Sequence, residues 1–136
     1  METRKMAILS VGIWLGLGIS AAAAETRLNS DQISALIEGN TTYGKHARKN
    51  IQGHAYWRPD GSYAGWNSDK GPTAGTWRVA DDKFCRTPQG EPEGCREIYD
   101  RGDGSYAHKV EPKNVMQPKQ HIWTWTKVAE GNPENL

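Results

Sequence analysis

The sequence predicts a mainly β protein: a small antiparallel β-barrel or strongly curved sheet of about eight short strands, with one short N-terminal helix and one disulfide. Three observations indicate this fold. Six Trp and five Tyr stand against a single Phe, and 15 Gly punctuate the 136-residue chain, a balance typical of strands and turns. Short segments that alternate in polarity are separated by Gly, Pro and Asp. The chain has two cysteines, an even number.

Residues 1–24 have the three zones of a secretory signal peptide. A short basic start precedes a stretch over 7–19 that is almost entirely apolar or small, and further small side chains follow. Ala22 and Ala24 fit the A-x-A cleavage rule, which predicts cleavage after Ala24. We therefore expect residues 25–136 to form a single β-rich domain.

The expected destination is the periplasm or the medium. A spanning helix needs about 20 apolar residues, and the apolar stretch here has roughly 14. We expect no stable membrane insertion once the signal peptide is removed. The alternative is an uncleaved segment that anchors the domain in the inner membrane.

The domain expected after cleavage is electrically neutral. Of the 17 Lys plus Arg and 16 Asp plus Glu in the chain, Arg4, Lys5 and Glu2 precede the cleavage site, which leaves 15 of each sign. A neutral domain has no general attraction for nucleic acid or for acidic membranes. We therefore expect no nucleic-acid partner.

Cys85 and Cys95 read as a disulfide in an exported protein. The loop between them holds two Pro and two Gly, and closing it should stabilise the fold by about 2–3 kcal/mol. A redox-active pair is the alternative. Nine intervening residues differ from the C-x-x-C spacing that lowers a thiol pKa, so the structural role is favoured.

The helix is expected over residues 28–39. Asn29 or Ser30 can cap its N-terminus, and Gly39 can end it. One apolar face follows helical spacing and comprises Ile33, Leu36 and Ile37. We expect this face to lie against the sheet and to plug one end of it.

Strands and turns account for residues 40–128. The expected strands occupy 41–43, 51–58, 62–66, 73–80, 84–86, 95–99, 105–110 and 121–128. Pro59-Asp60-Gly61 and Gly102-Asp103-Gly104 have hairpin-turn chemistry. The polar residues 129–136 are expected to form a loose tail.

Two predicted hairpins have similar sequences. Residues 56–64 and 99–107 agree at seven of nine positions, 43 residues apart. The pattern predicts one hairpin made twice, with its Tyr residues facing each other across the strands and with Arg58 and Arg101 in equivalent places beside the turns. Two origins stay open: convergence on good turn residues, or duplication of a three-strand unit.

The sequence offers no catalytic or metal motif. None of the four histidines, His46, His54, His108 and His121, pairs with another at the two- or four-residue spacing that places two ligands on one face. No nucleophile motif or phosphate loop is present. We therefore expect no catalytic residues, no metal site and no cofactor.

The run Gly-Thr-Trp-Arg-Val at 75–79, followed by Asp-Lys-Phe-Cys at 82–85, resembles a pattern in small, largely uncharacterised periplasmic proteins of Gram-negative bacteria. The Trp-Arg-Pro-Asp-Gly hairpin at 57–61 fits the same pattern. In that family a signal peptide and a short helix precede a lipocalin-like antiparallel sheet. The resemblance implies fold and compartment, and no functional residues.

The leading hypothesis for function is a periplasmic binding or accessory protein without catalysis, which holds a small apolar or envelope-derived ligand in a cup-shaped sheet. The candidate ligand-binding residues are Trp66, Trp77, Trp123 and Trp125, with Arg58 and Arg101. A protein-interaction module, such as an inhibitor or stabiliser of an envelope enzyme, is the alternative. A small hydrolase-like enzyme is the third.

Overall fold

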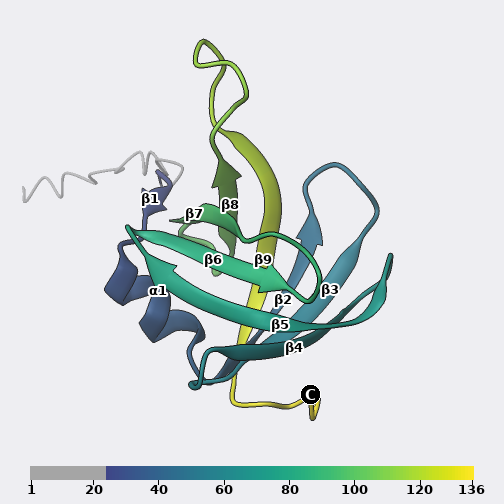
Figure 1. Cartoon of the computed structure of the whole chain (residues 1–136). Helices are drawn as coiled ribbons and strands as arrows, with labels where there is room; N and C mark the ends of the chain where they lie inside the picture. The colour runs from purple at the N-terminus through teal and green to yellow at the C-terminus, as the bar shows by residue number, and fades with distance from the viewer. Residues whose placement is uncertain (1–23) are drawn as a thin grey trace, which may run out of the picture.

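The computed structural model describes residues 24–136, and the predicted signal peptide lies almost wholly outside these residues. One helix and nine strands make up the described chain (Figure 1). Their bounds are β1 Thr26–Arg27, α1 Ser30–Ile37, β2 Asn40–His46, β3 Gln52–Trp57, β4 Ser62–Asn67, β5 Gly71–Ala80, β6 Lys83–Pro88, β7 Gly94–Asp100, β8 Tyr106–Val110 and β9 Gln120–Glu130.

Strands β2 to β9 form a closed antiparallel barrel of eight strands. Each pairs with the next along the chain, and β9 returns to pair with β2, so the sheet has no free edge between them. The two-residue β1 adds to β7, where it occupies the stretch that β6 leaves unpaired. The predicted fold class, with its N-terminal helix and its disulfide, is confirmed. Closure removes the exposed edges that an open sheet would present.

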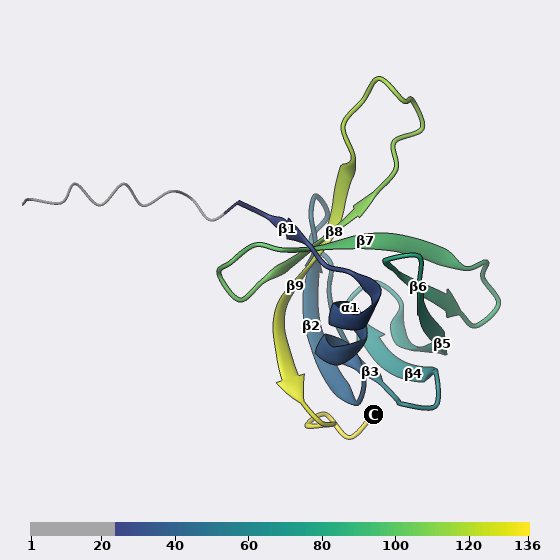
Figure 2. The ribbon, with the colours of Figure 1, turned by 90° about the vertical axis from the view of Figure 1, so that its left-hand side faces the viewer.

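Helix α1 covers one end of the barrel (Figure 2). Asn29 caps it as predicted, because its side chain accepts from the backbone N–H of Gln32 at 2.9 Å and the Gln32 side chain returns a bond to the Asn29 N–H. Ile33 and Ile37 are completely buried against the strands. Leu28, at the predicted start, lies before the helix, and its N–H pairs with the carbonyl of Ile98.

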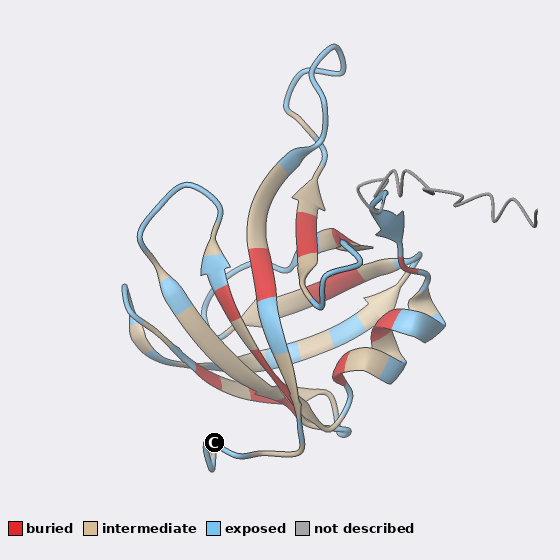
Figure 3. Cartoon of the chain, turned by 180° about the vertical axis from the view of Figure 1, so that it is seen from behind, coloured by how far each residue is buried: buried red, intermediate tan, exposed pale blue. Residues whose placement is uncertain are grey.

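The core fills the helix end of the barrel. It comprises Leu28, Ile33, Ile37, Trp57, Tyr63, Phe84, Ile98 and Trp125. Figure 3 shows these buried positions spread over α1 and the strands around it. Trp57 packs edge-on against Phe84 with ring centroids 4.9 Å apart, a preferred geometry for aromatic pairs. The aromatic residues of the strands therefore serve mainly as core at this end.

The last strand is longer than expected, and the tail is bonded to the barrel. Strand β9 continues through Ala129 and Glu130, which the sequence had placed in a loose tail, because they pair with the first residues of β2. Beyond them, Tyr43 donates its hydroxyl to Glu134 at 2.7 Å. This bond raises the pKa of Tyr43 to about 12. The predicted strand ended too early because the prediction used side-chain polarity. The backbone groups of Ala129 and Glu130 still form ladder hydrogen bonds, whatever their side chains.

The two repeated hairpins share the same Ser–Asp contact in the turn, although Gly102 has a positive φ of 77° at the position that Pro59 occupies in the first hairpin. Ser62 donates its N–H to Asp60 Oδ1 at 2.9 Å, and Ser105 does the same to Asp103. The backbone N–H groups of Arg58 and Arg101 bond the corresponding serine carbonyls, so the two arginines do occupy equivalent places.

The prediction for the tyrosines of these hairpins was wrong. Tyr56 lies opposite Ala64, and Tyr63 lies opposite Trp57. The same holds in the second hairpin, where Tyr99 lies opposite Ala107. The register places the two tyrosines of each hairpin at positions of opposite phase, so one of each pair points inward and the other outward.

Candidate ligand-binding site

A hollow of about 70 Å³ lies in the barrel toward the end opposite α1. Helix α1 leads into the Asn40 end of β2, and the hollow is lined by Gly44, near the other end of that strand. The volume suits a few water molecules or one small chemical group. It is well below the 300–1,000 Å³ typical of sites for drug-sized ligands.

The floor of the hollow is aromatic. Its apolar lining comprises Ala55, Trp57, Phe84, Trp123 and Trp125. Trp125 is 2% exposed and continues into the core. Trp123 lies against Gly44, where a Cβ atom would collide with the indole nitrogen. The close approach of β2 to Trp123 therefore requires glycine at position 44.

The rest of the lining is polar and basic. It includes Thr42, Asn67, Thr73, Arg86, Arg96 and His108. None of these residues is acidic, and no Asp or Glu from residues 24–136 lines the hollow. A basic interior without acidic groups is unusual, because an interior charge normally has a paired partner.

Strand alternation brings the two arginines to the inside. Arg96 lies directly opposite Phe84 on β6, and Phe84 is 1% exposed in the core. Arg86 follows Phe84 by two residues and therefore has the same inward phase. Cys85 and Cys95 lie opposite each other between these positions, with outward phase, and form the disulfide.

Neither interior arginine has an acidic partner. In the described part of the chain, no ion pair joins Arg86 or Arg96 to a carboxylate. Nη1 of Arg96 lies 3.4 Å from Nδ1 of His108. Burial, and secondarily the charge of Arg86, lower the pKa of Arg96 to about 9, which leaves it charged at neutral pH.

His108 is neutral at physiological pH. It is 1% exposed, and burial holds its pKa well below the ordinary value, with the charges of Arg96 and Arg86 acting in the same direction. Its ring meets Trp125 at a right angle, with centroids 4.2 Å apart. Within residues 24–136, neither its Nε2 nor the hydroxyl of Tyr63 finds a hydrogen-bond partner.

A second, more open hollow of about 290 Å³ lies on the outer face of β2, β3 and β4, because His54, Tyr43 and Trp66 have the phase opposite to that of the core residues Trp57 and Tyr63. The two share Gly44, Gly53, His54 and Trp66 in their linings. His54 stacks on Trp66 with centroids 5.8 Å apart and contacts Tyr43 on its other side. Trp66 is 42% exposed. The outer face of the barrel thus carries an aromatic surface, which the sheet separates from the basic interior.

The structure brings together three of the candidate residues. Trp123 and Trp125 line the inner hollow, whereas Trp66 borders both hollows and has outward phase, with its ring stacked on His54. Trp77 is elsewhere: it packs on the core, and its Nε1 donates to the carbonyl of Arg58 at 2.9 Å.

Arg58 and Arg101 do not line either hollow. They lie beside the hairpin turns, where Arg58 bonds Ser62 at 3.3 Å and Arg101 meets Glu25 at 3.5 Å. Sequence reasoning missed Arg86 and Arg96. The available signal was their phase, since each is two residues from a buried apolar residue in the same strand, Phe84 or Ile98.

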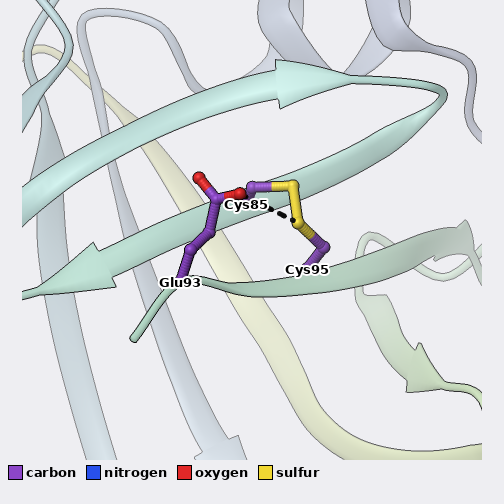
Figure 4. A group of neighbouring side chains, drawn as sticks. All are labelled: Cys85, Glu93 and Cys95. Atoms are coloured by element: carbon purple, nitrogen blue, oxygen red, sulfur yellow. Dashed lines mark hydrogen bonds between the residues drawn. A yellow bond between two sulfur atoms is a disulfide. The ribbon is translucent and has the colours of Figure 1, made fainter. Parts of the chain in front are cut away.

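Cys85, Cys95 and Glu93 also form a compact group, shown in Figure 4. Both sulfurs belong to the disulfide, and a metal would need a free thiolate. The Glu93 carboxylate binds Arg78 through two hydrogen bonds of 2.8 and 2.6 Å. The disulfide and the ion pair account for the group as a structural clamp on the loop between β6 and β7.

Comparisons of the chain with protein-family models, with curated proteins and with solved structures each find no match. The family resemblance of the sequence therefore stays a prediction.

Proposed function

We propose that the protein is a non-catalytic binding protein of the periplasm, which holds a small ligand at the open end of a lipocalin-like barrel. The observation that carries this proposal is the hollow inside the barrel, where aromatic rings meet two arginines and His108, whose Nε2 has no hydrogen-bond partner in the described chain. Ligand sites commonly combine apolar walls with a few polar groups that fix orientation. Eight-stranded barrels are wide enough to hold one small ligand.

The disulfide supports the compartment. The Cys85–Cys95 bond indicates an oxidising environment outside the cytoplasm. The predicted signal peptide narrows this location to the periplasm or the medium. Among residues 24–136, no helix has the length and apolar character needed to cross a bilayer.

Tryptophan fluorescence tests the proposal. The purified protein would be titrated with a panel of small apolar, envelope-derived and charged compounds, and saturable changes in emission would be recorded. We expect Trp123→Phe to reduce the response, because Trp123 lines the hollow. Trp77→Phe is the matched control, since Trp77 lies outside it. The proposal fails if no compound gives a saturable signal here or a heat of binding in calorimetry.

The absence of catalysis is part of the proposal. His108 is neutral and buried and contacts a cation, Arg96, instead of a carboxylate or a nucleophile. A general base is normally oriented by a group that stabilises its charged form. Each bound compound would be incubated with the protein and analysed by mass spectrometry. Unchanged compound is the expected result, and a protein-dependent product would refute this part.

A protein-interaction module remains the second candidate because of the loop between β8 and β9. This loop projects from the barrel (Figure 1) and exposes Val115 at 94% and Met116 at 88%. Exposed apolar side chains on a projecting loop favour contact with a partner. An envelope enzyme that co-purifies with the wild type and is lost from a Val115→Ser, Met116→Ser double variant would support this function. Retention of the enzyme by the variant would contradict it.

A further inference from the structure

We propose that the ligand carries an oxyanion, a carboxylate or a phosphate, which Arg86 and Arg96 bind inside the barrel. This inference rests on the proposed binding function and names its ligand class. The site is built from the inward-facing residues of β6 and β7 together with His108 from β8.

The inner hollow has hydrogen-bond donors in excess of acceptors. An arginine side chain offers five N–H donors and no acceptor. Neutral His108 adds one donor if its Nδ1 accepts from Arg96, as the 3.4 Å contact indicates. Two of the lining oxygens are already engaged. Thr42 Oγ1 accepts from Trp57 Nε1 at 2.9 Å, and Asn67 Oδ1 accepts two backbone N–H groups.

The hollow also has an excess of positive charge, because Arg86 and Arg96 line it and no acidic residue of the described chain does. The charge of Arg86 lowers the pKa of Arg96, and the charges of both arginines lower the pKa of His108. A buried cation without a counter-ion carries a large desolvation cost. An oxyanion would neutralise part of this charge and supply the missing acceptors. Arginine favours such groups, because its planar fork matches two oxygens of a carboxylate or phosphate.

The disulfide holds the two cations in place. Cys85 and Cys95 immediately precede Arg86 and Arg96 in the sequence, and the bond spans the same pair of strands. The crosslink therefore opposes the separation that repulsion between the guanidinium groups would favour. A preorganised pair of donors binds an anion without a further ordering cost.

The dimensions of the inner hollow limit the part of the ligand that lies inside it. About 70 Å³ inside the barrel accommodates the oxyanion group alone. The outward-facing His54 and Trp66 do not extend this inner site, so any apolar body attached to the oxyanion would contact the inner aromatic residues Trp123 and Trp125. A compound such as an aromatic acid fits this arrangement better than a long acyl chain.

Calorimetry with matched charged and neutral compounds tests the inference. The purified protein would be titrated at low salt with benzoate, phenyl phosphate and inorganic phosphate, and with benzamide as the neutral counterpart. We expect benzoate or phenyl phosphate to bind at least about 10-fold more tightly than benzamide. Preference for inorganic phosphate over both organic anions would identify a free-ion site, and preference for the organic anions would identify a two-part ligand.

Variants assign the effect to the interior arginines. Arg96→Met and Arg86→Met should each weaken anion binding at least about 10-fold, whereas Arg58→Met, beside a surface turn, should leave it unchanged. Arg96→Met should not lower the Tm of the unliganded protein, because it removes a half-buried charge that has no acidic partner in the described chain. Excess benzoate or phenyl phosphate should raise the Tm of the wild type and not that of this variant.

The outcomes separate the two proposals. Equal binding of benzoate, phenyl phosphate and benzamide would overturn the oxyanion inference and leave the binding function standing. Anion binding that Arg58→Met abolishes and Arg96→Met retains would also overturn it. If no compound in either series binds, both proposals fail.

Discussion

Removal of the disulfide gives the sharpest test of how this barrel is held together. The double variant Cys85→Ala, Cys95→Ala keeps the strands but removes the crosslink. Strands β6 and β7 pair at only three positions, and the Cys85–Cys95 pair is the central one. Every other neighbouring pair of strands in the barrel has more paired positions, so the disulfide closes the shortest ladder.

The expected cost follows from the loop that the disulfide closes. The sequence separation of 10 residues gives an unfolded-state entropy term of about 9 cal/mol/K, or about 2.7 kcal/mol at 25 °C. The exposed Arg78–Glu93 ion pair in the same loop can compensate little. For a domain of this size, a loss of about 2.7 kcal/mol lowers Tm by about 10 °C.

Urea unfolding followed by tryptophan fluorescence and by far-UV circular dichroism would measure this loss. Coincident transitions would establish two-state behaviour. Reductant should weaken the wild type to about the level of the variant and leave the variant unaffected. A loss below about 1 kcal/mol would refute the reasoning, because the loop would then be ordered without the crosslink.

Three further changes test the helix plug and a buried carboxylate. Ile37→Ala should cost about 2–5 kcal/mol in urea unfolding, since Ile37 is completely buried; a loss under about 1 kcal/mol would mean that α1 does not plug the core. Asn29→Ala should cost about 1 kcal/mol through the lost cap, and an unchanged midpoint would contradict that role. Burial acts to raise the pKa of Glu97, but its contacts with Lys119 and Arg27 have the larger combined effect. The pKa of Glu97 is therefore lowered from its ordinary value. Its stabilising contribution is therefore present above the unfolded pKa and lost as pH falls through the folded one. Glu97→Gln should flatten the decline of stability in acid, and an unchanged decline would exclude Glu97 as its source.

Much of the fold follows from local patterns in the chain. The Asn29 cap, the apolar face of α1 and the Asp-Gly turns act over a few residues, and the structure confirms each of them. Strand ends were less predictable. Ala129 and Glu130 have weak strand preferences, and they join β9 because their backbone groups pair with the facing end of β2.

The sequence predicted only part of the proposed binding site. Tryptophans signalled an aromatic lining, and Trp66, Trp123 and Trp125 do gather around the hollows. Trp77 is also a tryptophan in a strand, yet its position in the barrel packs it against the core instead of the hollow. Composition identifies which side chains can line a cavity, and their position along the barrel axis decides which of them do.

The sequence by itself determined the β class, the helix plug, the pair of like hairpins and the cysteine pairing, because each depends on residues near one another in the chain. Only the tertiary structure decided that the sheet closes and that Arg86, Arg96 and His108 meet in its interior. Closure joins β9 to β2 across most of the chain, and no local pattern encodes that contact. The inward phase of the arginines brings them to one hollow only because the barrel closes, since closure directs inward-facing side chains of neighbouring strands toward the same interior.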